Sequence, residues 1–77
     1  MKKSEFNEKM ADILEVEASA ITGEMALKDL SSWDSLAMLS FVALADSQFG
    51  VVIEGSKLAA CRTVDDLISL LPGKIED

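Results

Sequence analysis

The stretch SLAMLSFVALADSQF, residues 35–49, contains neither proline nor glycine and lies between two residues that commonly bound helices. Asp34 precedes it as the expected N-cap, and Gly50 follows as the expected stop in the left-handed conformation. At about 3.6 residues per turn, one face of this helix gathers the apolar residues expected to enter the core. They are Met38, Phe41, Val42, Ala45 and Phe49.

The same helix has a second apolar face, formed by Leu36, Leu39 and Ala43 and well separated from the first. A helix at the surface of a small domain needs only one apolar face, so the second must have a separate cause. The preceding segment, residues 16–34, is one candidate to cover it. A partner protein or a bound cargo is the other, and the two can coexist.

Two further segments have clear helical signals. Residues 4–15 repeat apolar side chains at helical spacing, and Ser4 is the expected N-cap. A last helix is expected after Thr63, because Thr63 and Asp66 match a capping box in its acidic form, and Pro72 should end it. Its inward side is predicted to hold Val64, Leu67, Ile68 and Leu71.

The remaining segments lack a long helical pattern. Residues 16–34 form a long connection, in which Leu27 and Leu30 are the expected anchors to the core and residues 26–30 a candidate helical turn. Residues 51–53 are β-branched, but too little chain surrounds them to make a sheet.

These segments predict an all-α fold: a small four-helix bundle with a long first loop and a short third helix near residues 56–61. A chain of 77 residues is expected to form a single domain, residues 1–77. A domain of this size buries only about 60% of the surface of its unfolded chain, so its core is thin.

The net charge is −7, from 14 acidic and 7 basic residues. This balance argues against binding to nucleic acid, whose phosphates attract Lys and Arg, and favours partners with basic surfaces. No apolar run is long enough to span a membrane, and no hydrophobic signal segment follows Lys2 and Lys3. We therefore expect a cytoplasmic protein, and a monomer.

The residue types present also restrict the chemistry. Histidine is absent, which excludes a Ser–His relay and a His-containing zinc site, and no metal site is expected. Cys61 is the single cysteine, so no internal disulfide can form, and a buried apolar role is expected for it. A domain this small and this poor in general bases is not expected to be an enzyme.

Ser35 places a hydroxyl at the start of the predicted central helix, beside the capping Asp34. A helix N-terminus presents free N–H groups and the positive end of the helix dipole, so it stabilises a phosphate attached there. A phosphodiester on Ser35 would also lie next to the apolar face of Leu36, Leu39 and Ala43.

With these features the chain resembles an acyl carrier protein or a related carrier (thiolation) domain. The resemblance covers nearly the whole chain, including its length, its acidity and the order of its segments. The similar stretches are DSLAMLSFVALADSQFGVVI, ILEVEASAIT and RTVDDLISLL, and Phe49 and Ile53 fall where such carriers keep core residues.

The resemblance implies that Ser35 carries 4′-phosphopantetheine, placed there by a phosphopantetheinyl transferase that uses coenzyme A. The thiol of this arm would hold an acyl or aminoacyl group as a thioester and present it to loading and processing enzymes with basic or apolar docking patches. Asp34 would shape the helix mouth and help the transferase to recognise it. Leu36, Leu39 and Ala43 would form the docking surface.

Two departures from the family pattern affect these expectations. Trp33 precedes Asp34, near where many carriers have glycine, and is a candidate contact for the loop or for partner enzymes. Asp46 is the only acidic residue within the predicted helix, whereas carriers of fatty acid synthesis tend to have several. This favours a specialised pathway, such as secondary-metabolite or surface-glycan synthesis, over primary fatty acid synthesis.

The alternative is a helical protein–protein interaction module without a prosthetic group. Such a module would keep the fold, the acidity and the exposed leucines, and the substitution Ser35→Ala would change little beyond the cap. In a carrier the same substitution would abolish loading while the fold survives.

Overall fold

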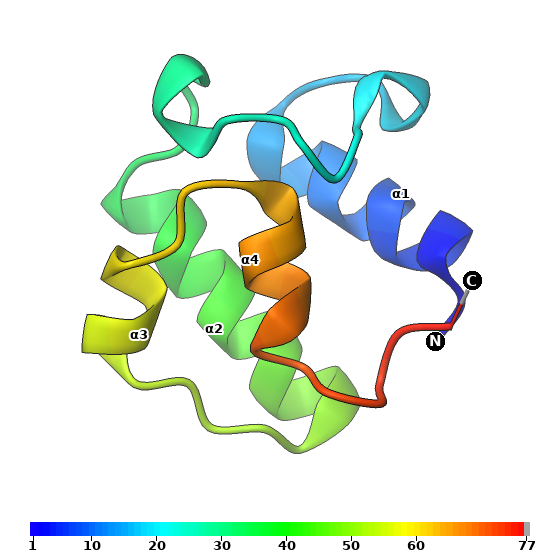
Figure 1. Ribbon diagram of the computed structural model, residues 1–77, viewed down its shortest axis with the longest axis vertical. Coiled ribbons are helices and arrows are strands. Elements are labelled where there is room, and N and C mark those ends of the chain that lie inside the picture. Colours follow the sequence, from blue (N-terminus) through cyan, green and yellow to red (C-terminus); the bar gives the residue numbers. More distant parts are fainter. Residues whose placement is uncertain (77) are drawn as a thin grey trace.

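The computed structural model describes residues 1–76, which form four α-helices: α1 (Lys3–Leu14), α2 (Ser35–Phe49), α3 (Gly55–Ala59) and α4 (Val64–Ser69). Two single turns of 3₁₀ helix, Ala18–Ala20 and Leu27–Asp29, interrupt the connection between α1 and α2. Figure 1 shows this connection crossing above α4, with α2 behind α4 and α3 beside them. The predicted all-α bundle with a long first loop and a short third helix is confirmed.

The limits of α2 are those predicted, because both are set by local chemistry. The Asp34 carboxylate accepts a hydrogen bond from the Ala37 backbone N–H at 3.0 Å. Gly50 has φ of +65°, and its N–H donates to the Asp46 carbonyl at 3.1 Å. A residue without Cβ adopts this left-handed conformation at little cost, so the helix ends there.

All four helices and the long connection contribute to the core. Its buried members are Phe6, Met10, Leu14, Ile21, Leu27, Phe41, Ala45, Ile53, Leu58, Val64, Leu67 and Leu71. In α2 the buried residues are Ala37, Phe41 and Ala45, whereas Met38 and Val42 are only half-buried. The inward face of α2 is therefore rotated from the predicted one, and small alanines flank the large Phe41 ring.

The start of α1 differs from the prediction. The helix begins at Lys3 with Lys2 as its N-cap and without a side-chain cap, so the assignment of Ser4 as N-cap is wrong. The reason is tertiary, because the Lys3 N–H donates to the Glu76 carbonyl at 2.6 Å. The C-terminal segment thus satisfies one of the N–H groups that the start of a helix leaves without an intrahelical partner.

The start of α4 is as predicted, but its end is not. Thr63 Oγ1 accepts from the Asp66 N–H, and Asp66 Oδ2 accepts from the Thr63 N–H, which completes the capping box. The regular helix ends at Ser69, before Pro72. Leu71 follows in a tighter turn, in which its backbone N–H donates to the Ile68 carbonyl.

The long connection is held to the start of α4 by backbone hydrogen bonds. Leu27 donates to Arg62 at 2.9 Å, and Asp65 donates to Gly23 at 2.9 Å. A Cβ on Gly23 would collide with the Asp65 carboxylate, so glycine allows this close approach. Leu27 is buried, as predicted for an anchor, and Leu30 packs against the core.

The termini lie side by side (Figure 1), where the Glu76 N–H donates to the Met1 carbonyl at 2.8 Å. Across residues 1–76, no helix combines the length and the apolar composition that a membrane crossing requires.

Candidate phosphopantetheine attachment site

Ser35 is the first residue of α2, and its side chain is exposed. None of the side-chain hydrogen bonds formed within residues 1–76 uses its hydroxyl. At this position the hydroxyl lies beside the N–H groups of the first helical turn and the positive end of the helix dipole. The group is therefore accessible, and an anion attached to it is favoured.

The backbone before Ser35 is fixed by a chain of turns. The Trp33 N–H donates to Leu30, and the Asp34 N–H donates to Ser32 at 3.0 Å. The Ser32 hydroxyl donates to the carbonyl of Leu14 at the end of α1. The N-terminus of α2 is thus linked to α1 by a hydrogen bond and is also capped by Asp34.

Trp33 is half-buried and packs against the core. It borders a hollow of about 320 Å³ between the long connection and the α3–α4 connection. The other residues around this hollow are Ala26, Leu27, Lys28, Cys61, Arg62 and Thr63. Trp33, two positions before Ser35, therefore faces a hollow that it shares with the residues that follow α3.

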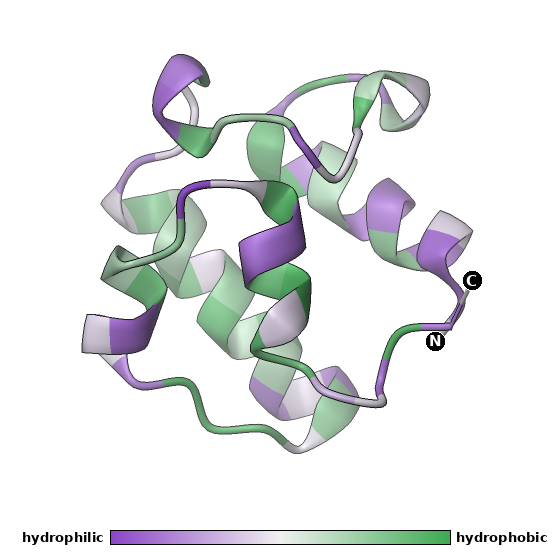
Figure 2. Ribbon diagram, in the orientation of Figure 1, coloured by the Kyte–Doolittle hydropathy of each residue, from purple (hydrophilic) through white to green (hydrophobic). Residues whose placement is uncertain are grey.

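The second apolar face of α2 is exposed. Leu36 is 73% exposed and Leu39 66%, and Ala43 is exposed beside them. The ribbon of α2 is green or pale along most of its length, with purple near its end (Figure 2). Nothing in the described part of the chain covers this face, so of the two candidates residues 16–34 do not cover it, and a partner or cargo is the one that remains.

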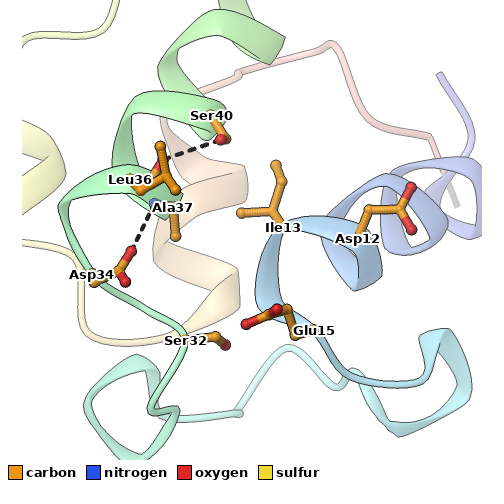
Figure 3. Close-up of a pocket in the computed structure, with 8 residues that line it drawn as sticks. All are labelled: Asp12, Ile13, Glu15, Ser32, Asp34, Leu36, Ala37 and Ser40. Atoms are coloured by element: carbon orange, nitrogen blue, oxygen red, sulfur yellow. Dashed lines mark hydrogen bonds between the residues drawn. The ribbon is translucent and has the colours of Figure 1, made fainter.

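A second hollow, of about 360 Å³, lies between the end of α1 and the start of α2 (Figure 3). Its lining residues are Asp12, Ile13, Glu15, Ser32, Asp34, Leu36, Ala37 and Ser40. Nothing in the sequence indicated that Asp12 and Glu15 lie near the start of α2. No local pattern could have done so, because the hollow that these residues share with Asp34 depends on how α1 and α2 pack.

Cys61 is half-buried, and its thiol lies 3.5 Å from the Lys57 carbonyl. Burial, with a smaller contribution from the nearby Asp66 carboxylate, raises the pKa of this thiol. A raised pKa disfavours the reactive thiolate, so Cys61 is poorly suited to nucleophilic chemistry.

The family model described as the phosphopantetheine attachment site matches residues 5–71. The chain belongs to this family.

The carrier is 32% identical to an acyl carrier protein of Petrotoga mobilis, over 97% of this chain and 93% of that protein. It is also 32% identical to meromycolate extension acyl carrier proteins of Mycolicibacterium aurum and Mycolicibacterium smegmatis. These matches cover 88% of the carrier, and 73% and 72% of the two relatives. No solved structure gives a significant match.

The family and these relatives establish a phosphopantetheine-bearing carrier protein, as the resemblance implied, and do not favour the module without a prosthetic group. Acyl carrier proteins are in general non-catalytic and work together with a phosphopantetheinyl transferase and acyl-processing enzymes. The mouth of α2 fits the phosphate of the group, because it combines an exposed hydroxyl with a helix N-terminus.

Proposed function

We propose that Ser35 is the residue to which 4′-phosphopantetheine is attached in this carrier. The observation that supports this most directly is its position as an exposed first residue of α2, with its hydroxyl free of hydrogen bonds within residues 1–76. When bound, the group supplies a thiol that carries an acyl or aminoacyl cargo as a thioester. Ser35 supplies the covalent anchor, and the first turn of α2 stabilises the negative charge at that anchor.

Asp34 has two roles in this proposal. Its carboxylate accepts from the Ala37 N–H and so holds the backbone that presents Ser35. Its exposed side chain also places a negative charge next to the hydroxyl that a transferase must reach. A transferase with a basic surface would be attracted to this charge.

Leu36, Leu39 and Ala43 form the proposed docking strip, the exposed apolar face of α2. An exposed apolar face beside a functional site is typical of a surface that partners cover. Trp33 contributes the flank of the site on the side of the α3–α4 connection and is a candidate contact for partner or cargo.

The proposal extends to the chain as a whole. Residues 1–77 form one carrier domain, since every helix contributes to a single core. We propose that the carrier is itself non-catalytic and monomeric, that it acts in the cytoplasm, and that it serves a specialised pathway. The last point is supported by the scarcity of acidic residues in α2, where Asp46 is the only one.

The test is an intact mass measurement after incubation with coenzyme A and a broad-specificity phosphopantetheinyl transferase. The wild-type chain should gain the mass of one phosphopantetheine group, and Ser35→Ala should gain none while keeping its helical circular dichroism spectrum. Added mass that persists in Ser35→Ala would show that another residue carries the group. No added mass on the wild-type chain would contradict the proposed function.

A further inference from the structure

The hollow beside Trp33 differs in charge from the chain as a whole. Its lining includes Lys28 and Arg62 but no aspartate or glutamate, although the chain has a net charge of −7. We propose that this hollow receives the tip of an acyl group that ends in a carboxylate and is carried by the arm on Ser35. Such a cargo is a dicarboxylic acid, bound as a thioester through one carboxyl group while the other stays ionised. This inference rests on the proposed function, because it assumes that the arm is attached to Ser35.

The two walls of the hollow are held together by backbone hydrogen bonds. The Leu27 N–H donates to the Arg62 carbonyl at 2.9 Å, and the Val64 N–H donates to the Met25 carbonyl at 3.2 Å. In Figure 1 the end of the long connection and the α3–α4 connection lie on the side of the molecule where α2 begins. Because these bonds do not depend on a ligand, the walls need little ordering when a cargo binds between them.

The positive charge of the hollow comes from Lys28 and Arg62. Both residues are exposed, and across residues 1–76 neither the Lys28 ammonium nor the Arg62 guanidinium takes part in a side-chain hydrogen bond. Asp66 does not line the hollow, and its Oδ2 accepts from the backbone N–H groups of Arg62 and Thr63. A guanidinium can donate two parallel hydrogen bonds to a carboxylate. An ionised carboxylate is therefore the complementary occupant.

The rest of the lining suits the methylene groups of such a cargo. Trp33, Leu27 and Ala26 offer apolar surface. Cys61 also lines the hollow, and burial, with a smaller contribution from Asp66, raises the pKa of its thiol. The thiol thus stays uncharged and does not repel an anion. An acyl group with methylenes behind a terminal carboxylate matches both parts of this lining.

The position of Ser35 makes a weak contact sufficient. Trp33 lies two residues before Ser35, so a group on the arm is tethered beside the hollow. Tethering through a short flexible linker gives an effective concentration on the order of millimolar. A contact whose Kd is also on the order of millimolar is then occupied about half of the time. Exposed ion pairs are individually weak, and tethering allows such pairs to hold the cargo.

The fluorescence of Trp33 provides the test. Trp33 is the only tryptophan of the chain and tyrosine is absent, so this fluorescence reports on the hollow. The measurement is its quenching by acrylamide, a neutral molecule whose access does not depend on charge.

Three arms are compared on the same chain. They are the bare arm, a glutaryl arm, and an arm of equal length that ends in a methyl ketone instead of a carboxylate. A broad-specificity phosphopantetheinyl transferase loads each arm from the corresponding coenzyme A derivative, and intact mass measurement verifies each product.

Two double variants separate the charge of the hollow from the charge of the chain. Lys28→Gln with Arg62→Gln removes the positive charge of the hollow. Lys2→Gln with Lys74→Gln removes the same charge from exposed residues near the chain ends, where the Met1 amino group donates to the Lys74 carbonyl. Thermal unfolding of each variant provides the folding control.

We expect the glutaryl arm to lower the quenching constant about twofold relative to the bare arm, since a hollow occupied half of the time shields the ring for that half. The methyl ketone arm should have little effect. The protection by the glutaryl arm should disappear in Lys28→Gln with Arg62→Gln and persist in the control variant. It should also weaken at high salt, because screening reduces the attraction between exposed charges.

Equal protection by the glutaryl and methyl ketone arms, or protection that survives Lys28→Gln with Arg62→Gln, would show that charge does not select the cargo and would overturn the inference. Full protection by the bare arm would also overturn it, because the cations would then bind the phosphodiester on Ser35. Loaded chains in which no arm protects Trp33 would contradict the inference and leave the attachment intact. A wild-type chain that gains no mass would contradict the proposed function itself.

Discussion

The Ser32 hydroxyl donates a hydrogen bond to the Leu14 carbonyl, and this bond joins the turn before α2 to the end of α1. The two residues are far apart in sequence, yet their contact helps to set the position of the N-terminus of α2 relative to α1. The hydroxyl thereby donates to a carbonyl that the end of a helix leaves without an intrahelical partner. The position of the proposed attachment site is consequently set by two helices, not by α2 alone.

Removing that link should weaken both the fold and the site. Ser32→Ala is expected to lower the free energy of unfolding by about 1 kcal/mol, the usual value of one intramolecular hydrogen bond. Urea denaturation measures this loss. Ser31→Ala, which removes an exposed hydroxyl one residue earlier, is the matched control and should be close to neutral. A Ser32→Ala variant as stable as the control would show that the link contributes nothing.

The cap and the charge of Asp34 can be separated by two substitutions. Asp34→Ala removes the bond to the Ala37 N–H and should cost about 1 kcal/mol of unfolding free energy. Asp34→Asn keeps a capping oxygen and should be nearly as stable as wild type, but it loses the negative charge beside Ser35. Transferase kinetics should then show slower loading of Asp34→Asn at unchanged stability. Loading of Asp34→Asn at the wild-type rate would limit the role of Asp34 to capping.

Substitutions in the docking strip should slow loading without lowering the stability of the fold. Leu36→Ala combined with Leu39→Ala should change the free energy of unfolding by no more than about 0.5 kcal/mol, because both side chains are mostly exposed. Loading by the transferase should slow, through a higher KM. Val52→Ala is the control, since Val52 is 84% exposed and lies outside the strip. Equal loading of the double variant and the control would argue against the strip.

Glu15 ends α1 with φ of +55°, a left-handed conformation that is costly for residues with a Cβ. Glu15→Gly relieves this cost and should raise the unfolding free energy by roughly 0.5 kcal/mol, after the added flexibility of the unfolded chain is subtracted. A loss of stability on thermal unfolding would contradict the assignment of strain to Glu15.

The Asp66 carboxylate should account for part of the stability that the fold loses at low pH. Hydrogen bonds from the backbone N–H groups of Arg62 and Thr63 lower the pKa of its carboxyl below the ordinary value. The folded state therefore favours the ionised form, and the resulting stability is present above the unfolded pKa and lost as the pH falls through the folded pKa. Asp66→Asn should lower stability at neutral pH, and the difference from wild type should narrow below about pH 4.

Urea unfolding at a series of pH values measures that difference. Asp65→Asn is the control, because Asp65 is exposed and lies outside the capping box. If the difference in unfolding free energy between Asp66→Asn and wild type stayed constant with pH, the capping carboxylate would not titrate in the expected way.

The parts of the fold that the sequence predicted correctly are those determined by neighbouring residues. Asp34 and Gly50 bound α2 through contacts within a few positions, and Thr63 with Asp66 begins α4 in the same way. The assignment of Ser4 failed because the donor of Lys3 is satisfied by Glu76, at the other end of the chain.

The same distinction applies to the site. The position of Ser35 and the apolar face beside it follow from the helical period of one segment. Two features could not be predicted: the rotation of α2 that buries Ala37, and the approach of Glu15 to the turn before α2. Both depend on how α1 packs against α2.

The adjacency of the two chain ends has a practical consequence. In Figure 1 the termini lie at the opposite side of the molecule from the first turn of α2, which bears Ser35. Flexible peptides fused at either end, or a short peptide that circularises the polypeptide, would therefore leave the start of α2 unobstructed. The architecture suits immobilisation on a surface or insertion between other proteins, with the proposed attachment residue far from the points of fusion.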